Sequence, residues 1–177
     1  MVGRKKHKDG AAATKILLPF AGQSISKRSL EAAVRLAKSE DGVIMPALLA
    51  RVPMTLPIDS PLPASCLTTM PLLEAIEQSA TRQGARVDAR VSRGRTAIDA
   101  LRRLLETEQF DRIIVSADGS GRHGLSNIDV DWVLRKAPAE VLVLRPGPED
   151  QREITAGTAA AGIGSFATTG RTEFISR

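Results

Sequence analysis

The segment "DRIIVSADGSGRHGLSNIDVDWVLRKAPAEVLVLRP", residues 111–146, decides the fold of this chain. Its apolar runs at 111–118 and 139–146 are typical of strands that are covered on both faces. Between them lie a glycine-rich loop and a helical pattern at 126–137. A strand, a helix and a further strand in this order predict a crossover between two parallel strands.

The same alternation continues toward the N-terminus of the chain. Pro46 predicts an irregularity or an edge position in its strand, and residues 53–70, with four prolines, predict a loop. Five strands and four helices together predict a mainly parallel α/β sheet with helices on both faces. The remaining expected elements are strands at 14–20, 42–52 and 85–94 and helices at 26–41, 71–84 and 95–109.

The two ends of the chain differ in composition from its centre. Residues 1–12 are basic and polar, and residues 148–177 mix small residues with scattered glycines and have no sustained period. We therefore expect a disordered N-terminal tail at 1–12, one domain at 13–147 and a flexible C-terminal tail at 148–177.

Composition and cysteine content indicate the compartment. No apolar run approaches the ~18 residues of a membrane span, and no hydrophobic segment follows the basic N-terminus as in a secretory signal. The single cysteine, Cys66, has no partner for an internal disulfide. These features predict a cytoplasmic protein without a membrane span.

The net charge of +5 is concentrated at one end of the chain. Residues 1–10 contain four basic residues and one acidic residue, which accounts for +3 of the total. The chain has 3% aromatic residues and no tyrosine, so it offers few platforms for base stacking. We do not expect the folded domain to bind nucleic acid.

The glycine-rich loop contains the pattern G-x-G-x-x-G at Gly119, Gly121 and Gly124. A dinucleotide-binding turn follows the first strand of its unit and has an acidic residue about 20 positions later. This loop follows the fourth strand, and Glu140 lies at the wrong end of the fifth. Two interpretations remain open: a strand-to-helix turn that needs positive φ, and a ligand-binding loop of another kind.

Three segments resemble the universal stress protein (UspA-like) family. "KILLPFAGQS" (15–24) resembles its first strand and turn, and "VSRGRTAIDAL" (91–101) resembles its third strand with the following glycine. The segment at 111–146 resembles its ending, D-x-I-V-x-G-x-x-G-x-x-G-L-S followed by V-L-R-x-A-P-x-x-V-L-V-V-R. The resemblance implies a doubly wound, five-stranded parallel sheet in the order 3-2-1-4-5, with the layering of adenine nucleotide alpha hydrolase-like and flavodoxin-like proteins.

That strand order reverses between strands 1 and 4, and ligands of open α/β sheets bind beyond the carboxyl ends of the strands at such a point. The loops at 20–24 and 117–124 face it. By resemblance, ATP-binding members use these loops for adenosine and phosphates. The corresponding degenerate nucleotide or anion site comprises Ala21, Gly22, Asp118, Gly119, Gly121, Arg122, His123, Gly124 and Ser126.

The chain departs from the family pattern at three points. Ala21 replaces an aspartate, Asp118 replaces the first loop glycine, and the later G-[ST] is absent. A carboxylate at 118 repels phosphate, so we expect ATP to bind weakly or not at all. Arg122 and His123 offer charge-assisted bonds to an anion, or are simply solvated as loop-tip residues are.

No metal or catalytic site is expected. Asp118, Asp129 and Asp131 form an acidic group, but Ser126 followed by Asp129 is typical of a helix N-cap. Cys66 lies in a proline-rich loop, and no third group is evident that would orient it with His123. We predict a non-enzymatic protein.

The expected function is a regulatory, stress-response binding module. One alternative is a domain that binds ATP or AMP, or hydrolyses ATP slowly, through residues 117–124. Another is a domain that modulates a transporter or other protein partner through a sheet edge or the 53–70 loop. The strand at 139–146 is apolar yet lies at the sheet edge, which predicts a homodimer through it, as in many universal stress proteins.

Overall fold

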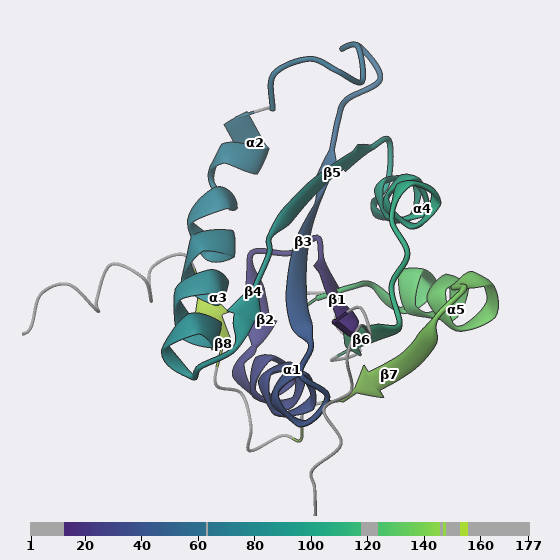
Figure 1. The fold of residues 1–177 in the computed structure, drawn as a ribbon. Coiled ribbons are helices and arrows are strands. Elements are labelled where there is room, and N and C mark those ends of the chain that lie inside the picture. The colour runs from purple at the N-terminus through teal and green to yellow at the C-terminus, as the bar shows by residue number, and fades with distance from the viewer. Residues whose placement is uncertain (1–12, 63, 118–123, 146, 148–152, 156–177) are drawn as a thin grey trace, which may run out of the picture.

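In the computed structural model the chain is built on a parallel sheet in the order β4-β3-β1-β6-β7, with β5 continuing β4 alongside β3 (Figure 1). The structure describes residues 13–62, 64–117, 124–145, 147 and 153–155. Counted as five positions, this order is 3-2-1-4-5, so the predicted topology is confirmed. The strands of this sheet are β1 (Lys15–Phe20), β3 (Val43–Arg51), β4 (Arg86–Val87), β5 (Arg90–Gly94), β6 (Arg112–Ser116) and β7 (Glu140–Leu144).

Helices cover both faces of the sheet, as predicted (Figure 1). One core cluster joins the sheet to α1 (Lys27–Ser39) and α3 (Met70–Arg82). The other joins it to α4 (Ala97–Thr107) and α5 (Asn127–Lys136). Successive side chains of a strand point to opposite faces, and the central strand β1 is therefore apolar from Ile16 to Phe20 and supplies both clusters.

The predicted strand at 85–94 is divided into β4 and β5, and Pro46 accounts for the division. Pro46 lies inside β3, an interior strand, so the edge position is wrong and the irregularity is correct. Asp88 N–H donates to Ile44 O (2.9 Å) and Val52 N–H donates to Gly94 O (2.9 Å). Alternate residues of β3 direct their backbone groups to the same neighbour, so Pro46 faces the same side as Ile44. Proline has no N–H to donate, and this gap lies opposite the break between β4 and β5.

A second, two-stranded sheet was not predicted. Here β2 (Ser24–Ser26) pairs antiparallel with β8 (Glu153–Thr155), and Ile25 lies opposite Ile154. Ile154 is only 5% exposed and belongs to the α1–α3 core cluster. Residues 153–155 are thus a packed part of the domain, whereas we expected them in the C-terminal tail. The other residues of both predicted tails lie outside the described ranges.

Residues 53–62 form the loop that the prolines predict, and a short helix α2 (Ala64–Leu67) follows it. The Arg95 guanidinium donates to the carbonyl oxygens of Val52 (3.3 Å), Pro53 and Leu56 (2.9 Å), which ties the start of this loop to the start of α4. Among the described residues, no helix combines the length and hydropathy that crossing a bilayer requires.

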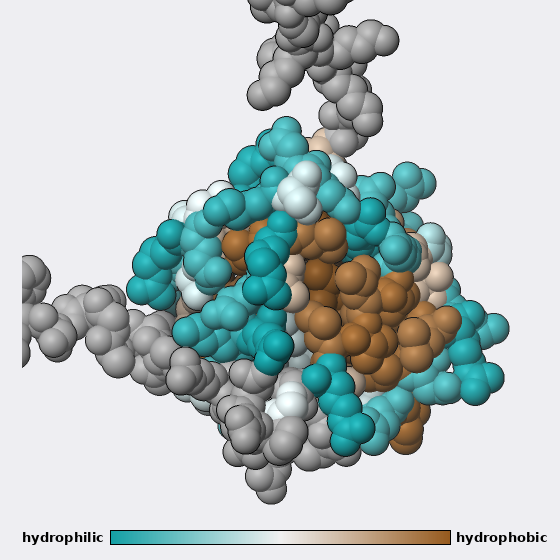
Figure 2. Space-filling model, turned by 90° about the horizontal axis from the view of Figure 1, so that it is seen from below, coloured by the Kyte–Doolittle hydropathy of each residue, from teal (hydrophilic) through white to brown (hydrophobic). Residues whose placement is uncertain are grey.

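Among the described residues, the two edges of the sheet differ in character. At one edge, β7 carries four consecutive apolar residues, and Val143 is 40% exposed. Figure 2 shows a continuous apolar surface on the side of the molecule where this strand lies. At the other edge, β5 has the sequence Arg-Val-Ser-Arg-Gly and is largely polar.

Candidate functional site

The structure brings the ends of the two predicted loops together beside the carboxyl ends of β1 and β6. Ala21 N–H donates to Gly124 O at 3.1 Å, and Gly124 N–H donates weakly to Ser24 O at 3.4 Å. Ala21 is exposed and Gly22 is half-buried. The reversal of strand order therefore lies between these two loop ends, where ligands of open α/β sheets bind.

Gly124 has the conformation expected of a turn glycine. Its φ is +72°, and a Cβ at this position would lie 2.4 Å from Ser116 O. The base of the loop closes through a bridge between Ala117 and Gly124. The turn interpretation is therefore satisfied at this glycine. The predicted site residues Asp118, Gly119, Gly121, Arg122 and His123 lie outside the described residues, and their roles stay predictions.

Ser126 and Asp129 form a reciprocal cap at the start of α5, as the sequence predicts. Asp129 N–H donates to Ser126 Oγ (3.3 Å), and the Asp129 carboxylate accepts from Ser126 Oγ (2.7 Å) and Ser126 N–H (3.3 Å). Asp131 instead pairs with Arg135 one turn later. The described part of the chain holds no group of three or more metal-ligating side chains. The carboxylate of Asp129 thus occupies donors that a bound anion would otherwise use.

A cavity of about 460 Å³ opens at this edge of the sheet, within the size range of small-molecule sites. It extends from the loop after β1 across the end of β3 to the starts of α3, α4 and α5. Its lining combines apolar side chains with two threonines, one amide, one guanidinium group and one carboxylate. The lining residues are Ala21, Gln23, Leu48, Leu49, Ala50, Arg51, Cys66, Thr69, Thr96, Ala97 and Asp129.

Cys66 lies in the cavity wall, and its hydrogen-bond partner among the described residues is a backbone oxygen rather than a base. Its side chain is buried, and Sγ lies 3.9 Å from the backbone oxygen of Arg51. A carbonyl oxygen accepts a hydrogen bond but does not act as a general base for a thiol. His123, the candidate base for this thiol, is outside the described ranges.

Thr96 caps the helix that bounds the far side of the cavity. Thr96 Oγ1 accepts from Asp99 N–H (3.1 Å), and the Asp99 carboxylate accepts from Arg95 N–H (2.8 Å). Gly94, just before this cap, has no room for a side chain, because a Cβ would lie 2.2 Å from Ala100 N. This close approach of β5 and α4 explains the glycine after the third strand.

Clearly shifted pKa values are found away from the cavity. A hydrogen bond from Arg90 lowers the pKa of Asp88, and hydrogen bonds to Asp88 and Glu108 raise the pKa of Arg90. A hydrogen bond to Glu40 raises the pKa of Arg112. None of these residues lines the cavity, so within the described residues the shifts reflect structural ion pairs rather than tuned acid–base groups.

Several solved universal stress proteins have the same arrangement of strands and helices. One from Archaeoglobus fulgidus has a TM-score of 0.57 at 14% identity over 75% of this chain and 93% of that chain. One in complex with cAMP gives 0.53 at 20% identity over 76% and 98%. An AMP-bound family protein from Arabidopsis thaliana gives 0.52 at 14% identity over 78% and 95%.

The chain has the universal stress protein fold. No family model matches the sequence, and no curated protein matches it. The family resemblance of the sequence and the structural likeness therefore agree on the fold. Relative to the universal stress protein pattern, the first loop lacks its aspartate, since Ala21 occupies that position.

Sequence reasoning missed most of the cavity that accompanies this universal stress protein fold, because of its eleven lining residues only Ala21 belongs to the predicted site. Thr69, Thr96 and the end of β3 were not predicted as site residues. A signal existed for Thr96, because a threonine followed three positions later by an acidic residue is typical of a helix N-cap. A helix start after a parallel strand lies at the same sheet edge as the predicted loops.

Proposed function

We propose that this chain is a regulatory, stress-linked binding module of the cytoplasm that acts without catalysis and binds ATP weakly or not at all. The observation that carries the proposal is the nature of two side chains in the cavity lining, Ala21 and Asp129. Ala21 offers no carboxylate to an adenosine hydroxyl, while the Asp129 carboxylate accepts from the hydroxyl and N–H of Ser126 at the start of α5, donors that suit a phosphate.

Electrostatics give the size of the repulsion between the Asp129 carboxylate and a phosphate. Two unit charges about 4 Å apart interact by ~1 kcal/mol in water and ~4 kcal/mol near a protein surface, and like charges repel. A phosphate beside Asp129 meets this repulsion and also competes for the Ser126 N–H. ATP carries more negative charge than AMP, and its affinity falls further.

A second candidate function is binding of a nucleoside monophosphate. A stronger version of this candidate adds slow hydrolysis of ATP. The cavity of about 460 Å³ at the reversal of strand order favours it, and so do the two structures of this fold that contain cAMP and AMP. In this version Arg122 and His123 supply the anion contacts that Asp129 does not.

Titration calorimetry with ATP, AMP and cAMP tests the proposal. We expect no ATP binding tighter than about 100 μM. Ala21→Asp restores the carboxylate of the family pattern and should strengthen AMP binding by about tenfold, the effect of one charged hydrogen bond. Gln23→Asp, which adds the same charge to the same cavity wall, serves as the control. Nucleotide that co-purifies with the chain, or sub-micromolar ATP binding, would contradict the proposal.

A further inference from the structure

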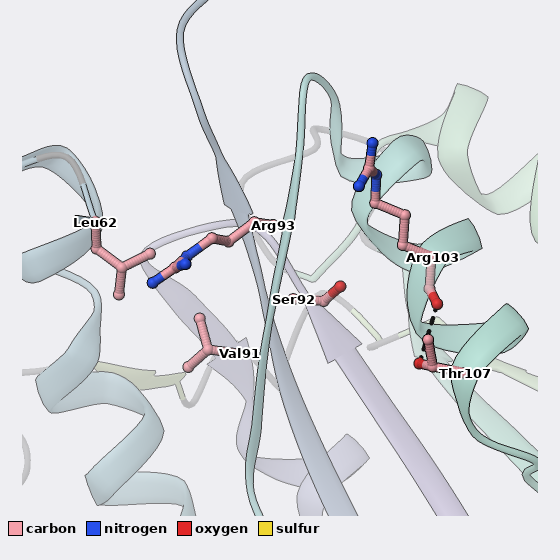
Figure 3. A pocket seen from close by; sticks show the side chains of 6 residues that line it. All are labelled: Leu62, Val91, Ser92, Arg93, Arg103 and Thr107. Atoms are coloured by element: carbon pink, nitrogen blue, oxygen red, sulfur yellow. Dashed lines mark hydrogen bonds between the residues drawn. The ribbon is translucent and has the colours of Figure 1, made fainter. Parts of the chain in front are cut away.

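The outer edge of β5 forms the floor of an open groove of about 470 Å³. Figure 3 shows that Val91 and Arg93 point to the side of Leu62, while Ser92 points to the opposite side. Ser92 Oγ donates to Ala100 O of α4 at 2.7 Å, which fixes that orientation. Arg103 and Thr107 of α4 complete the second wall. The groove therefore has walls on both sides of one strand edge.

Backbone groups on the floor of the groove have no partner strand among the described residues. Within β5, Gly94 O accepts from Val52 N–H, so Gly94 faces β3. In a parallel strand alternate residues direct their N–H and C=O groups to opposite neighbours, so those of Val91 and Arg93 face outward. In the part of the chain that the structure describes, β3 is the strand that pairs with β5, and no strand pairs with its outer edge.

The groove is positively charged. Arg93 and Arg103 lie on opposite walls, and its lining contains no carboxylate. Arg103 has a long ion pair with Asp99 (3.7 Å), and the Asp99 carboxylate also accepts a backbone hydrogen bond from Arg95. Among the described residues, Arg93 has no acidic partner. An incoming carboxylate thus finds two guanidinium groups with spare donors.

These charges determine which strand can join this edge. Charged residues protect sheet edges, because a second copy of β5 would bring arginines together. An extended acidic segment meets opposite charges instead, and opposite-charge pairs across adjacent strands are stabilising. Neighbouring glutamates in such a segment would point to the two walls in turn, one toward Arg93 and one toward Arg103.

We propose that the outer edge of β5 binds an extended acidic segment of a partner protein as an added strand. The backbone of the segment pairs with Val91 and Arg93, and its carboxylates pair with Arg93 and Arg103. This interaction surface goes beyond the proposed function, since it uses no residue of the nucleotide-sized cavity.

Fluorescence anisotropy with a labelled Thr-Thr-Glu-Glu-Glu-Thr-Thr peptide tests the proposal on the full chain. We expect saturable binding that Arg93→Glu and Arg103→Glu each weaken by about tenfold or more. The matched control is Arg35→Glu, on the exposed face of α1, which should change affinity by less than about twofold. Peptide methylated on the glutamate backbone nitrogens should also bind about tenfold more weakly, because it cannot complete the ladder.

Thermal melts of each variant separate loss of binding from loss of fold. The proposal is wrong if the peptide fails to bind at about 1 mM, or if the methylated peptide binds equally well. It is equally wrong if Arg35→Glu weakens binding as much as Arg93→Glu, because general charge would then explain the effect. A single-stranded oligodeoxythymidine that displaces the peptide equally well would assign the edge to polyanions and overturn the proposal.

Discussion

At the scale of single residues, Gly124 shows how a loop position becomes fixed. Among the described glycines, it alone combines a positive φ with a steric clash at the Cβ position. Gly84 has a positive φ (+80°) in open space, and Gly147 has neither constraint. Substitutions at these three glycines therefore distinguish the cost of a strained φ from the cost of a steric clash.

We expect Gly124→Ala to lower the free energy of unfolding by at least about 2 kcal/mol, from left-handed strain plus the clash with Ser116 O. Gly84→Ala should cost about 1 kcal/mol, and Gly147→Ala should stay within about 0.5 kcal/mol. Urea unfolding of the three variants checks this order. Equal costs at positions 124 and 84 would show that the loop base relaxes around the added methyl group.

Asp88 gives a residue-scale prediction on pH. Its pKa lies below the ordinary value of 3.8 in the folded protein, mainly through the hydrogen bond from Arg90. A carboxyl with a lowered folded pKa stabilises the fold above its unfolded pKa, and this stabilisation disappears as pH falls through the folded pKa.

Because the side chain of Asp88 is 53% exposed, the contribution should be below about 1 kcal/mol. We expect Asp88→Asn to be less stable than the wild-type chain at about pH 7, by a margin that narrows toward about pH 3, as measured by urea unfolding across pH. A difference of the same size at both pH values would rule out titration of this carboxyl as the cause.

At the scale of elements, the sequence reveals some features and conceals others for physical reasons. The interior strands were predictable because burial on both faces demands unbroken apolar runs such as Ile16–Leu18. The cap at Ser126 was predictable because its signal is local. The pairing of β2 with β8 was not, because two three-residue strands so far apart in the sequence leave no period to detect. The place of Cys66 in the cavity wall was not predictable either, because it depends on how the segment 53–70 packs against the rest of the domain.

Strand β8 leads to an element-scale prediction about the domain boundary. Truncation before residue 156 keeps the buried Ile154, whereas truncation before residue 148 removes it. We expect the shorter chain to be less stable than the longer one by about 2 kcal/mol, the value of burying one such side chain. Urea unfolding of both chains measures the difference. Equal stability of the two chains would place the end of the domain at residue 147, as the sequence predicts.

At the scale of the whole molecule, the two sheet edges suit different partners. The edge at β5 is basic, whereas β7 has the apolar sequence Val141–Leu144, in which Val143 is exposed. Charge protects the first edge from self-association, and the second carries charge only near its ends. A two-fold axis at β7 would bury this apolar surface against its own copy.

We expect a dimer through β7, and the ladder indicates how to test it. Ala117 N–H donates to Leu144 O and Glu140 N–H donates to Asp111 O, so by alternation the N–H of Val143 faces outward. Val143→Pro therefore removes an outer donor without removing a bond to β6, and it should convert the dimer to a monomer. Light scattering at about 50 μM measures the mass of each chain, well above the dissociation constant of a stable dimer.

The matched control for this dimer is Val91→Pro, which removes an outward donor from the opposite edge of the sheet. Because β5 is basic and would meet like charge in a second copy, this variant should remain dimeric. A wild-type monomer would refute the dimer, and a dimer that survives Val143→Pro but is lost with Val91→Pro would move the interface to β5. That last result would also contradict the assignment of the basic edge to an acidic partner, because two arginine-bearing strands would then pair with each other.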